Sequence, residues 1–346
     1  MRWLWAGRGP GARLARALLL PLSALYGAVM LLREALYRSG RRRVTPLPLP
    51  AVAVGNLTVG GAGKTPVAAW IAQWLLDAGA HPAILLRGYG GDEPLVHARL
   101  VPGALVQANP DRPRGAELAR GAGADTLVLD DAYQTLAVGR DLNLALVAVE
   151  HLDYAPWLLP AGPWREGWGA LGRADGIIVT RKHASPDAAA ALADRIARRW
   201  PRTPVGIVHL ALTGFSALRS GQPAPEGALA GRRVMAAAGV ADPESFAAQL
   251  REQAGTVQLV AYQDHHAYDD ADVATLLSAG AGADYVVVTE KDAVKLRPRW
   301  PADAREPLVA ALGVRWERGR EAIAGLLSSR MSRPPRSSTD PSTTVI

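Results

Sequence analysis

The sequence predicts an α/β protein in which mostly parallel strands are covered by helices on both faces. From Pro46 onward, short apolar runs alternate with stretches of helical periodicity, which is the order of elements in βα units. The alternation breaks near residues 210–231 and then resumes, so two α/β domains are expected. At 346 residues, with 49% apolar and 21% charged positions, the chain can fill two folded cores.

The elements before the break are predicted from apolar runs and helical spacing. Strands are expected over 51–55, 82–87, 126–130, 143–149, 176–180 and 204–208. Helices are expected between several of them, notably over 65–77 and 186–199. In the first of these helices the apolar residues recur at helical spacing, namely Val67, Trp70, Ile71, Trp74 and Leu75.

A second α/β series follows the break. Its expected strands are Val234–Ala238, Val257–Tyr262, Tyr285–Thr289 and Leu308–Val314, with helices near 243–254, 269–279 and 317–328. The last sixteen residues are rich in Ser, Thr and Pro, which is typical of disorder. The predicted division is an N-terminal segment 1–44, a first domain 45–210, a linker 211–231, a second, smaller α/β domain 232–330 and a disordered tail 331–346.

Residues 52–67 contain the parts of a nucleotide triphosphate site in the required order. An apolar run is followed by a glycine-rich turn, whose backbone N–H groups would face phosphate oxygens, and by a helix whose dipole favours them. Lys64 would reach the outer phosphates and Thr65 would ligate Mg²⁺. The predicted nucleotide-binding residues are Thr58, Val59, Gly60, Gly61, Ala62, Gly63, Lys64 and Thr65.

The same loop predicts a P-loop NTPase-like α/β/α sandwich for the first domain. The strict pattern has glycine where this chain has Thr58, so a glycine-rich turn with a chance Lys-Thr is the alternative. The strand before the loop, the helix after it and the acidic strand end at Asp130 and Asp131 favour the nucleotide site. In such sheets an acid at this place meets Mg²⁺ directly or through water.

Two further groups are candidates for chemistry. Asp92 follows the second strand, where parallel sheets place their ligands, and it could accept the proton of an attacking hydroxyl. A flexible turn with solvated acids is the alternative. Asp264-His265-His266 follows a strand of the second domain; one histidine could orient or tune a carboxylate base, or the pair could be structural.

Two sequence tests favour ATP over GTP. Relatives that dimerise around bound ATP carry Lys directly before Gly-Gly, and this chain has Val59 there. Guanine-specific enzymes usually carry Asn/Thr-Lys-x-Asp after a later strand, and neither Thr180-Arg-Lys-His nor Thr289-Glu-Lys-Asp has that spacing. A nucleotide-switch or metallochaperone-like NTPase, which transfers phosphate only to water, is the rival class.

Composition excludes several functions. Cysteine is absent, which excludes disulfides, thiolate catalysis and cysteine-based metal sites. The net charge of +7 belongs to the N-terminus, because the first 43 residues hold nine arginines and one acid, Glu34, for a net +8, which leaves −1 for the rest. A neutral body disfavours a nucleic-acid-binding ATPase, so no nucleic-acid partner is expected.

The N-terminal segment is predicted to contact a membrane surface. Ala17–Leu32 is an uncharged run of 16 residues flanked by arginines, with Trp3 and Trp5 before it. As a helix it would span about 24 Å, short of the roughly 30 Å of a hydrocarbon core. An interfacial helix held to anionic lipid is preferred. A single span, a secretory signal and a plain buried helix are the alternatives.

The chain also resembles a known family. The motifs that carry the resemblance are Gly55-Asn56, Thr58-Val-Gly-Gly-Ala-Gly-Lys-Thr-Pro66, Arg87-Gly-Tyr-Gly, Gly91-Asp-Glu-Pro94, Leu129-Asp-Asp-Ala-Tyr-Gln134, Arg140-Asp-Leu142, Leu159-Pro-Ala-Gly-Pro-Trp-Arg-Glu166, Asp264-His-His266 and Thr289-Glu-Lys-Asp292. Over about residues 15 to 325 the sequence is similar to tetraacyldisaccharide 4′-kinases, the lipid A kinases of Gram-negative bacteria. The family's own loop has threonine at the position of Thr58.

The resemblance implies an ATP-dependent kinase that phosphorylates the 4′-hydroxyl of a tetraacylated glucosamine disaccharide 1-phosphate. It also implies two α/β/α domains joined by a two-stranded linker, and a peripheral location on the cytoplasmic face of the inner membrane. The resemblance makes Asp92 the base, assisted by His265. It associates Asp130, Asp131 and Glu166 with Mg²⁺–ATP.

Three departures from the family pattern are visible. The family usually has some twenty residues between Arg-Gly-Tyr-Gly and Gly-Asp-Glu-Pro, whereas here the two motifs are fused before Asp92. The family's Asp-Asp-Gly-(Phe/Met)-Gln-His becomes Asp-Asp-Ala-Tyr-Gln-Thr, which replaces a histidine by Thr135. Tyr154-Ala-Pro-Trp157 stands where Gly-Asn-Gly is usual.

Overall fold

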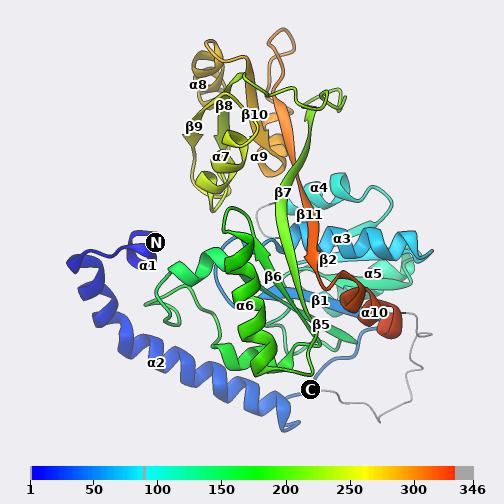
Figure 1. Cartoon of the computed structure of the whole chain (residues 1–346). Coiled ribbons are helices and arrows are strands. Elements are labelled where there is room, and N and C mark those ends of the chain that lie inside the picture. Colours follow the sequence, from blue (N-terminus) through cyan, green and yellow to red (C-terminus); the bar gives the residue numbers. More distant parts are fainter. Residues whose placement is uncertain (1, 89–90, 332–346) are drawn as a thin grey trace. The chain divides into compact units, whose positions relative to one another are not determined.

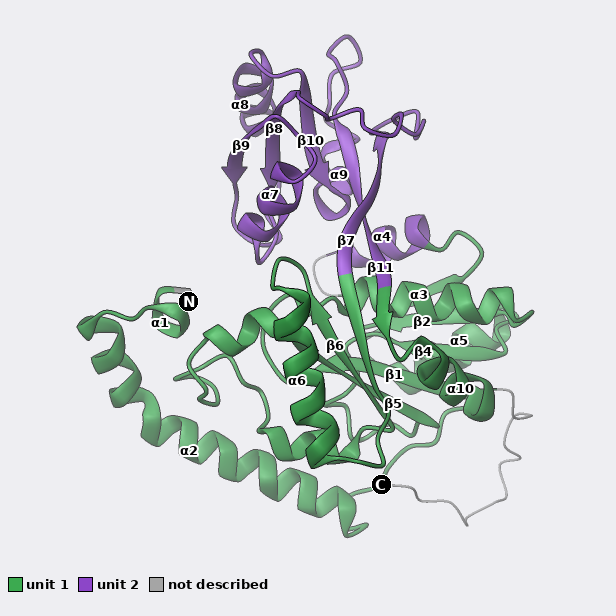
Figure 2. Cartoon of the chain, in the orientation of Figure 1, with its two compact units in different colours: residues 1–88, 101–209, 316–346 green, residues 89–100, 210–315 purple. Residues whose placement is uncertain are grey.

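The computed structural model describes residues 2–88 and 91–331, and these form two compact units (Figures 1 and 2). Unit 1 comprises residues 1–88, 101–209 and 316–346, and unit 2 comprises residues 89–100 and 210–315. The chain leaves unit 1 within strand β7 (Val205–Ala217) and returns to it within β11 (Leu308–Arg318), as the colour changes in Figure 2 show. Strand β7 extends into the stretch predicted as linker.

Unit 1 is built on a parallel sheet with the strand order β3-β2-β4-β1-β5-β6-β7. Each neighbouring pair in this order is parallel. Besides β7, the strands are β1 (Ala51–Asn56), β2 (Pro82–Leu86), β3 (Leu105–Ala108), β4 (Thr126–Leu129), β5 (Leu142–Ala148) and β6 (Gly176–Arg181). Residues of β1 and β2 are buried throughout, as expected for central parallel strands covered on both faces.

The helices of unit 1 are α1 (Arg2–Ala6), α2 (Pro10–Arg38), α3 (Lys64–Asp77), α5 (Arg112–Gly121), the 3₁₀ helices η1 (Val149–Asp153) and η2 (Trp168–Arg173), α6 (Pro186–Arg199) and α10 (Arg320–Met331). The local sequence explains why α6 forms. The Ser185 side chain caps the helix by accepting a hydrogen bond from the Ala188 N–H, and Leu192 and Ile196 lie four residues apart on its buried face. The predicted tail lies outside the described residues except Met331, which ends α10 and is buried.

Unit 2 is a smaller α/β unit with the strand order β11-β10-β8-β9, again parallel in each pair. Its further strands are β8 (Arg233–Ala238), β9 (Thr256–Ala261) and β10 (Tyr285–Thr289), and its helices are α4 (Glu93–Leu100), α7 (Pro243–Arg251), α8 (Asp270–Gly280) and α9 (Glu290–Leu296). Along β8, Met235 and Ala237 enter one apolar cluster while Val234 and Ala236 enter another. Both faces of this sheet are therefore covered.

Candidate functional site

The predicted phosphate loop connects β1 to α3 in unit 1. Gly63, directly before the first residue of α3, has φ = 82°, and Gly60 has φ = 117°. L-residues with a side chain rarely adopt these angles, so glycine is required at both turns of the loop. The loop therefore has the backbone shape that brings N–H groups to the start of a helix.

Hydrogen bonds from three directions hold this loop in place. The Val59 N–H donates to the Pro163 carbonyl at 2.7 Å, and the Thr180 hydroxyl donates to the Ala62 carbonyl at 3.0 Å. The Thr58 hydroxyl lies 2.6 Å from Nδ1 of His151, and both side chains are buried. This contact gives a physical reason for threonine where the strict pattern has glycine.

Lys64 begins α3 and extends back over the loop toward β1. Its Nζ donates to Oδ1 of Asn56 at 3.1 Å and lies 3.7 Å from Oδ1 of Asp131. Thr65 is the next residue of the helix and is half-buried. The structure thus brings together the lysine and one of the two predicted carboxylates.

The two carboxylates after β4 have different surroundings. Asp130 is 4% exposed, whereas the Asp131 side chain is 40% exposed and has φ = 47°, a left-handed conformation unusual for a residue other than glycine. Arg112 donates to the backbone carbonyls of both, at 2.7 and 3.0 Å. Arg165 pairs with the Asp131 carboxylate at 3.1 Å. Asp131, whose backbone has this left-handed conformation, is the carboxylate that lies 3.7 Å from Lys64.

Glu166 is buried beside the same group of residues. Its Oε2 accepts from Nη2 of Arg173 at 2.8 Å and from Nε2 of Gln134 at 3.4 Å, and Gln134 also donates to the Asn56 carbonyl at 2.7 Å. Arg173 in addition pairs with Glu34 of α2 at 2.9 Å. Gln134 therefore connects Glu166 to the end of β1.

The oxygen ligands near the loop suit magnesium chemically. Mg²⁺ prefers carboxylate and hydroxyl oxygens together with phosphate oxygens and water, and Asp131, Glu166 and Thr65 offer the protein share of such a set. Among residues 2–88 and 91–331, no three His, Asp or Glu side chains cluster closely enough to hold a metal ion by themselves. The residues near the loop are thus oxygen ligands of the kind that Mg²⁺ accepts.

Asp92 lies in unit 2, directly before α4, and is 2% exposed. Its Oδ2 lies 3.0 Å from Nζ of Lys295 on α9 and 3.1 Å from Nδ1 of His265. Burial alone would raise the pKa of the Asp92 carboxyl, but Lys295 and His265 outweigh burial and hold that pKa below its ordinary value. The carboxyl is consequently ionised at neutral pH and able to accept a proton.

His265 is held in position by its own backbone. It has φ = 60°, and its N–H donates to the Gly239 carbonyl at 3.1 Å. The Gly239 N–H in turn donates to the buried Asp292 carboxylate, which also accepts from the Tyr268 hydroxyl at 3.0 Å. The neighbouring His266 turns elsewhere, with Nε2 2.8 Å from Oδ2 of Asp272. His265 faces the Asp92 carboxylate, whereas His266 contacts Asp272 in the first turn of α8.

The sequence-predicted residues thus form two groups, each inside one unit. Unit 1 holds the loop, Lys64, Asp131 and Glu166, while unit 2 holds Asp92 and His265. Tyr89 and Gly90 of the Arg-Gly-Tyr-Gly motif lie outside the described residues. The sequence did not predict the supporting roles of Asn56, His151, Arg173, Lys295 and Asp292. Of these five residues, only Asn56 and Asp292 lie within a motif that the sequence analysis identified.

Comparison with known proteins places the chain in a family. The sequence model of the family described as tetraacyldisaccharide-1-P 4′-kinase matches residues 15–332. The chain belongs to this family. The tetraacyldisaccharide 4′-kinase of Pelobacter propionicus is 40% identical over 312 residues, which cover 81% of this chain and 83% of the relative. That of Azoarcus sp. is 38% identical over 334 residues, covering 89% and 91%.

A solved member of the tetraacyldisaccharide 4′-kinase family has the same fold. The structure of LpxK from Aquifex aeolicus in complex with ATP superposes with a TM-score of 0.73 at 27% identity, covering 92% of this chain and 99% of that one. The predicted fold class and the predicted family are therefore confirmed. Membership of a kinase family disfavours the nucleotide-switch alternative.

Proposed function

We propose that this chain transfers the γ-phosphoryl group of ATP to the 4′-hydroxyl of a tetraacylated glucosamine disaccharide 1-phosphate. The product would be the 1,4′-bisphosphate precursor of lipid A. Family membership over residues 15–332 carries the proposal, together with Lys64 at the start of the loop helix. The Aquifex relative was solved with ATP, which supports ATP as the donor.

In unit 1, the loop from Thr58 to Thr65 would hold the nucleotide phosphates. Loop N–H groups and Lys64 would neutralise charge on the β- and γ-phosphates, which is how phosphoryl transfer is chiefly accelerated. Thr65, Asp130, Asp131 and Glu166 would hold Mg²⁺. When bound, Mg²⁺ would supply positive charge that offsets the negative charge of the transferring phosphate.

In unit 2, Asp92 would accept the proton of the attacking sugar hydroxyl. The oxygen then forms its bond to the γ-phosphorus, the bond from phosphorus to the β-phosphate oxygen breaks, and ADP leaves with that electron pair. His265 and Lys295 would keep the carboxylate ionised and oriented before the proton arrives. The domain division predicted from the sequence, with a kinase domain over 45–210 and a second domain over 232–330, belongs to the same proposal.

The N-terminal helix supports a membrane surface as the place of reaction. Helix α2 is long and apolar enough to cross a membrane, and 11% of its apolar window is buried. Six of its seven exposed large apolar side chains recur three or four residues apart and so share one face; they are Leu14, Leu18, Leu22, Leu25, Val29 and Leu32, and the seventh is Leu31. Its other face packs on unit 1, where the Ser23 hydroxyl donates to the Leu158 carbonyl at 2.9 Å.

A helix with one face packed on protein and the other apolar and exposed suits a bilayer interface better than a span. We therefore propose that the protein binds a membrane surface, and the family resemblance favours the cytoplasmic face of the inner membrane. Arginines near the helix ends would contact anionic headgroups. No nucleic-acid partner belongs to this proposal.

The decisive experiment supplies the full chain with Mg²⁺, γ-labelled ATP and a tetraacylated disaccharide 1-phosphate in detergent micelles. Label is expected in the lipid, with mass and NMR placing the new phosphate on the 4′-oxygen. The Lys64→Ala variant is the control and should transfer little label. Release of label only as inorganic phosphate, equal with and without lipid, would overturn the proposal in favour of a nucleotide hydrolase.

A further inference from the structure

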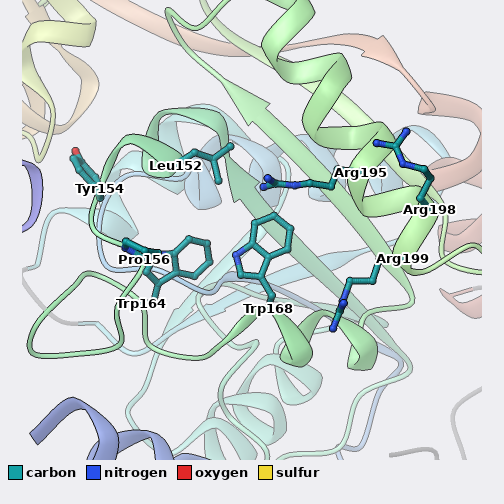
Figure 3. A pocket seen from close by; sticks show the side chains of 8 residues that line it. All are labelled: Leu152, Tyr154, Pro156, Trp164, Trp168, Arg195, Arg198 and Arg199. Atoms are coloured by element: carbon teal, nitrogen blue, oxygen red, sulfur yellow. The ribbon is translucent and has the colours of Figure 1, made fainter. Parts of the chain in front are cut away.

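Unit 1 contains a cavity of about 850 Å³ that is lined by none of the residues assigned to the proposed reaction. Its walls come from η1 and the loop after it, from the start of η2 and from the last turns of α6 (Figure 3). One side is apolar and aromatic, with Leu152, Pro156, Trp164 and Trp168, and the other side is cationic. This volume lies in the range of sites that hold one small ligand or a lipid tail.

The aromatic side is a continuous apolar surface. The rings of Trp164 and Trp168 have centroids 6.0 Å apart and are tilted by 33°, and Trp164 is buried. Figure 3 shows both indoles facing the hollow beside Leu152. A surface of this kind suits an acyl chain, because burying methylene groups against it removes apolar area from water.

The cationic side consists of Arg195, Arg198 and Arg199 of α6. Their spacing of three and four residues places them on one face of the helix, where like charges repel. Within residues 2–88 and 91–331, no carboxylate forms an ion pair with any of the three. Arg195 instead stacks over Trp168 at 4.6 Å (Figure 3). Arg199 likewise stacks over Trp200 at 5.2 Å. Three guanidinium groups without a carboxylate partner, beside an apolar wall, favour a ligand with a phosphate and a hydrocarbon tail.

The loop that lines this cavity is also tied to the N-terminal helices. Nε1 of Trp5 donates to the Pro160 carbonyl at 3.1 Å, and the Ala155 N–H donates to the Trp5 carbonyl at 2.9 Å. The Ser23 hydroxyl of α2 holds the same loop at Leu158. The cavity wall is therefore joined to the helix whose exposed leucines form the proposed membrane surface.

We infer that this cavity binds an anionic glycerophospholipid, with its phosphate on the three arginines and an acyl chain along Trp164 and Trp168. The inference goes beyond phosphoryl transfer, since it gives the protein a second lipid site. It relies on the membrane location in the proposed function but not on the reaction.

Tryptophan quenching tests the assignment directly. The full chain, in detergent micelles without nucleotide, is titrated with phosphatidylglycerol or phosphatidylcholine carrying dibrominated acyl chains. The quenching that is lost in Trp168→Phe comes from the cavity. This difference separates the quenching of Trp168 from that of Trp3 and Trp5. Phosphatidylglycerol should quench Trp168 at a concentration at least about fivefold lower than phosphatidylcholine.

The charge requirement is tested by the double variant Arg198→Ala/Arg199→Ala. It should bind phosphatidylglycerol about tenfold more weakly, because two charge-assisted contacts are lost. The matched control is Arg202→Ala/Arg320→Ala, two exposed arginines of unit 1 outside the cavity, which should bind as the parent does. All four arginines are exposed, so unchanged thermal midpoints should show that both variants fold.

Several results would overturn the inference. These are equal quenching by the two lipids, equal weakening in the control variant, full displacement by inorganic phosphate alone, or stoichiometric displacement by the tetraacylated disaccharide 1-phosphate. The last result would assign the cavity to the acceptor. Because no nucleotide is present, failure here leaves the kinase assay unaffected, and failure of the kinase assay leaves the quenching result standing.

Discussion

Nζ of Lys295 lies 3.0 Å from the same Asp92 oxygen that His265 approaches at 3.1 Å. The carboxylate is almost fully buried, so without these partners its pKa would rise. We expect Lys295→Met to raise that pKa and therefore to move the acid limb of the kcat–pH profile to higher pH. Lys291→Met, which removes the 3.5 Å pair with Glu93, is the comparison variant; Lys291 is the smallest of the influences that lower the pKa of Asp92, so the limb should move less than in Lys295→Met. An unmoved acid limb in Lys295→Met would show that Asp92 is not the titrating base.

Asp92 and His265 should behave as one functional unit. Asp92→Asn removes the proton acceptor, and we expect kcat to fall about 10²- to 10³-fold, within the usual range for general acid–base groups. His265→Ala should lower kcat less, and the double variant should be no worse than Asp92→Asn alone, because the histidine acts through the carboxylate. His266→Ala is the control, since it contacts Asp272 instead. If the increases in activation free energy of the two single variants added up in the double variant, Asp92 and His265 would not act as a pair.

Lys64 should matter more than Asp92. Lys64→Ala removes a charge from the start of the phosphate loop, and we expect kcat/KM to fall by about 10³-fold or more, since charge stabilisation is the dominant contribution. Arg120→Ala, which removes a surface pair with Glu117, should have no effect. Steady-state kinetics with the lipid acceptor decide the matter. Near-normal turnover in Lys64→Ala would show that the loop is not the nucleotide site.

The exposed face of α2 should control membrane binding. Leu18 and Leu25 are 72% and 64% exposed, and replacing both with Asn removes apolar area that a bilayer would bury. We expect co-sedimentation with anionic vesicles to weaken at least about tenfold. Leu95→Asn/Leu118→Asn changes two exposed leucines on other helices and should sediment as the parent does. Equal sedimentation of both variants would rule out this face as the anchor.

Glu290 should make unit 2 less stable as pH rises. Burial raises the pKa of Glu290 from its ordinary 4.5 to about 7. The folded state therefore prefers the protonated form of Glu290. The contribution of this group to the free energy of unfolding is complete below pH 4.5 and is lost as pH rises toward 7. Glu290→Gln should remove about 2 kcal/mol of this pH dependence, measured by urea unfolding between pH 5 and 8. Glu226→Gln, an exposed acid, should leave the dependence intact.

Local sequence patterns predicted those helices and strands whose formation is determined by residues close in the sequence. The phosphate loop was found because strand, glycine turn and helix follow one another within sixteen residues. Strand β3 and helix α9 were missed: none of the four residues of β3 is buried, and α9 has only seven residues. Helix α5 was missed because its buried positions are mostly small, such as Gly115 and Ala116, and make no large apolar stripe.

The pairing of the site residues could not be predicted without the family resemblance. Asp92 and His265 are 173 residues apart, and only the fold of unit 2 brings them together. Lys295 has no sequence signature, since a lysine on a short helix is normally solvent-exposed. The choice of Asp131 over Asp130 depends on a positive φ that nothing in an Asp-Asp pair reveals. Side-chain direction and distant neighbours are tertiary properties.

Arg173 is the counter-ion of two acids that come from different parts of the chain. It holds Glu166 at 2.8 Å and Glu34, the single acid among the first 43 residues, at 2.9 Å. A shared guanidinium cannot be drawn toward one carboxylate without loosening its hold on the other. In the proposed function, a cation at Glu166 would compete with Arg173 for that carboxylate, and a bilayer that shifted α2 would act on the same guanidinium through Glu34. Cation binding and membrane attachment would then be coupled through one arginine, with the same coupling free energy in both directions.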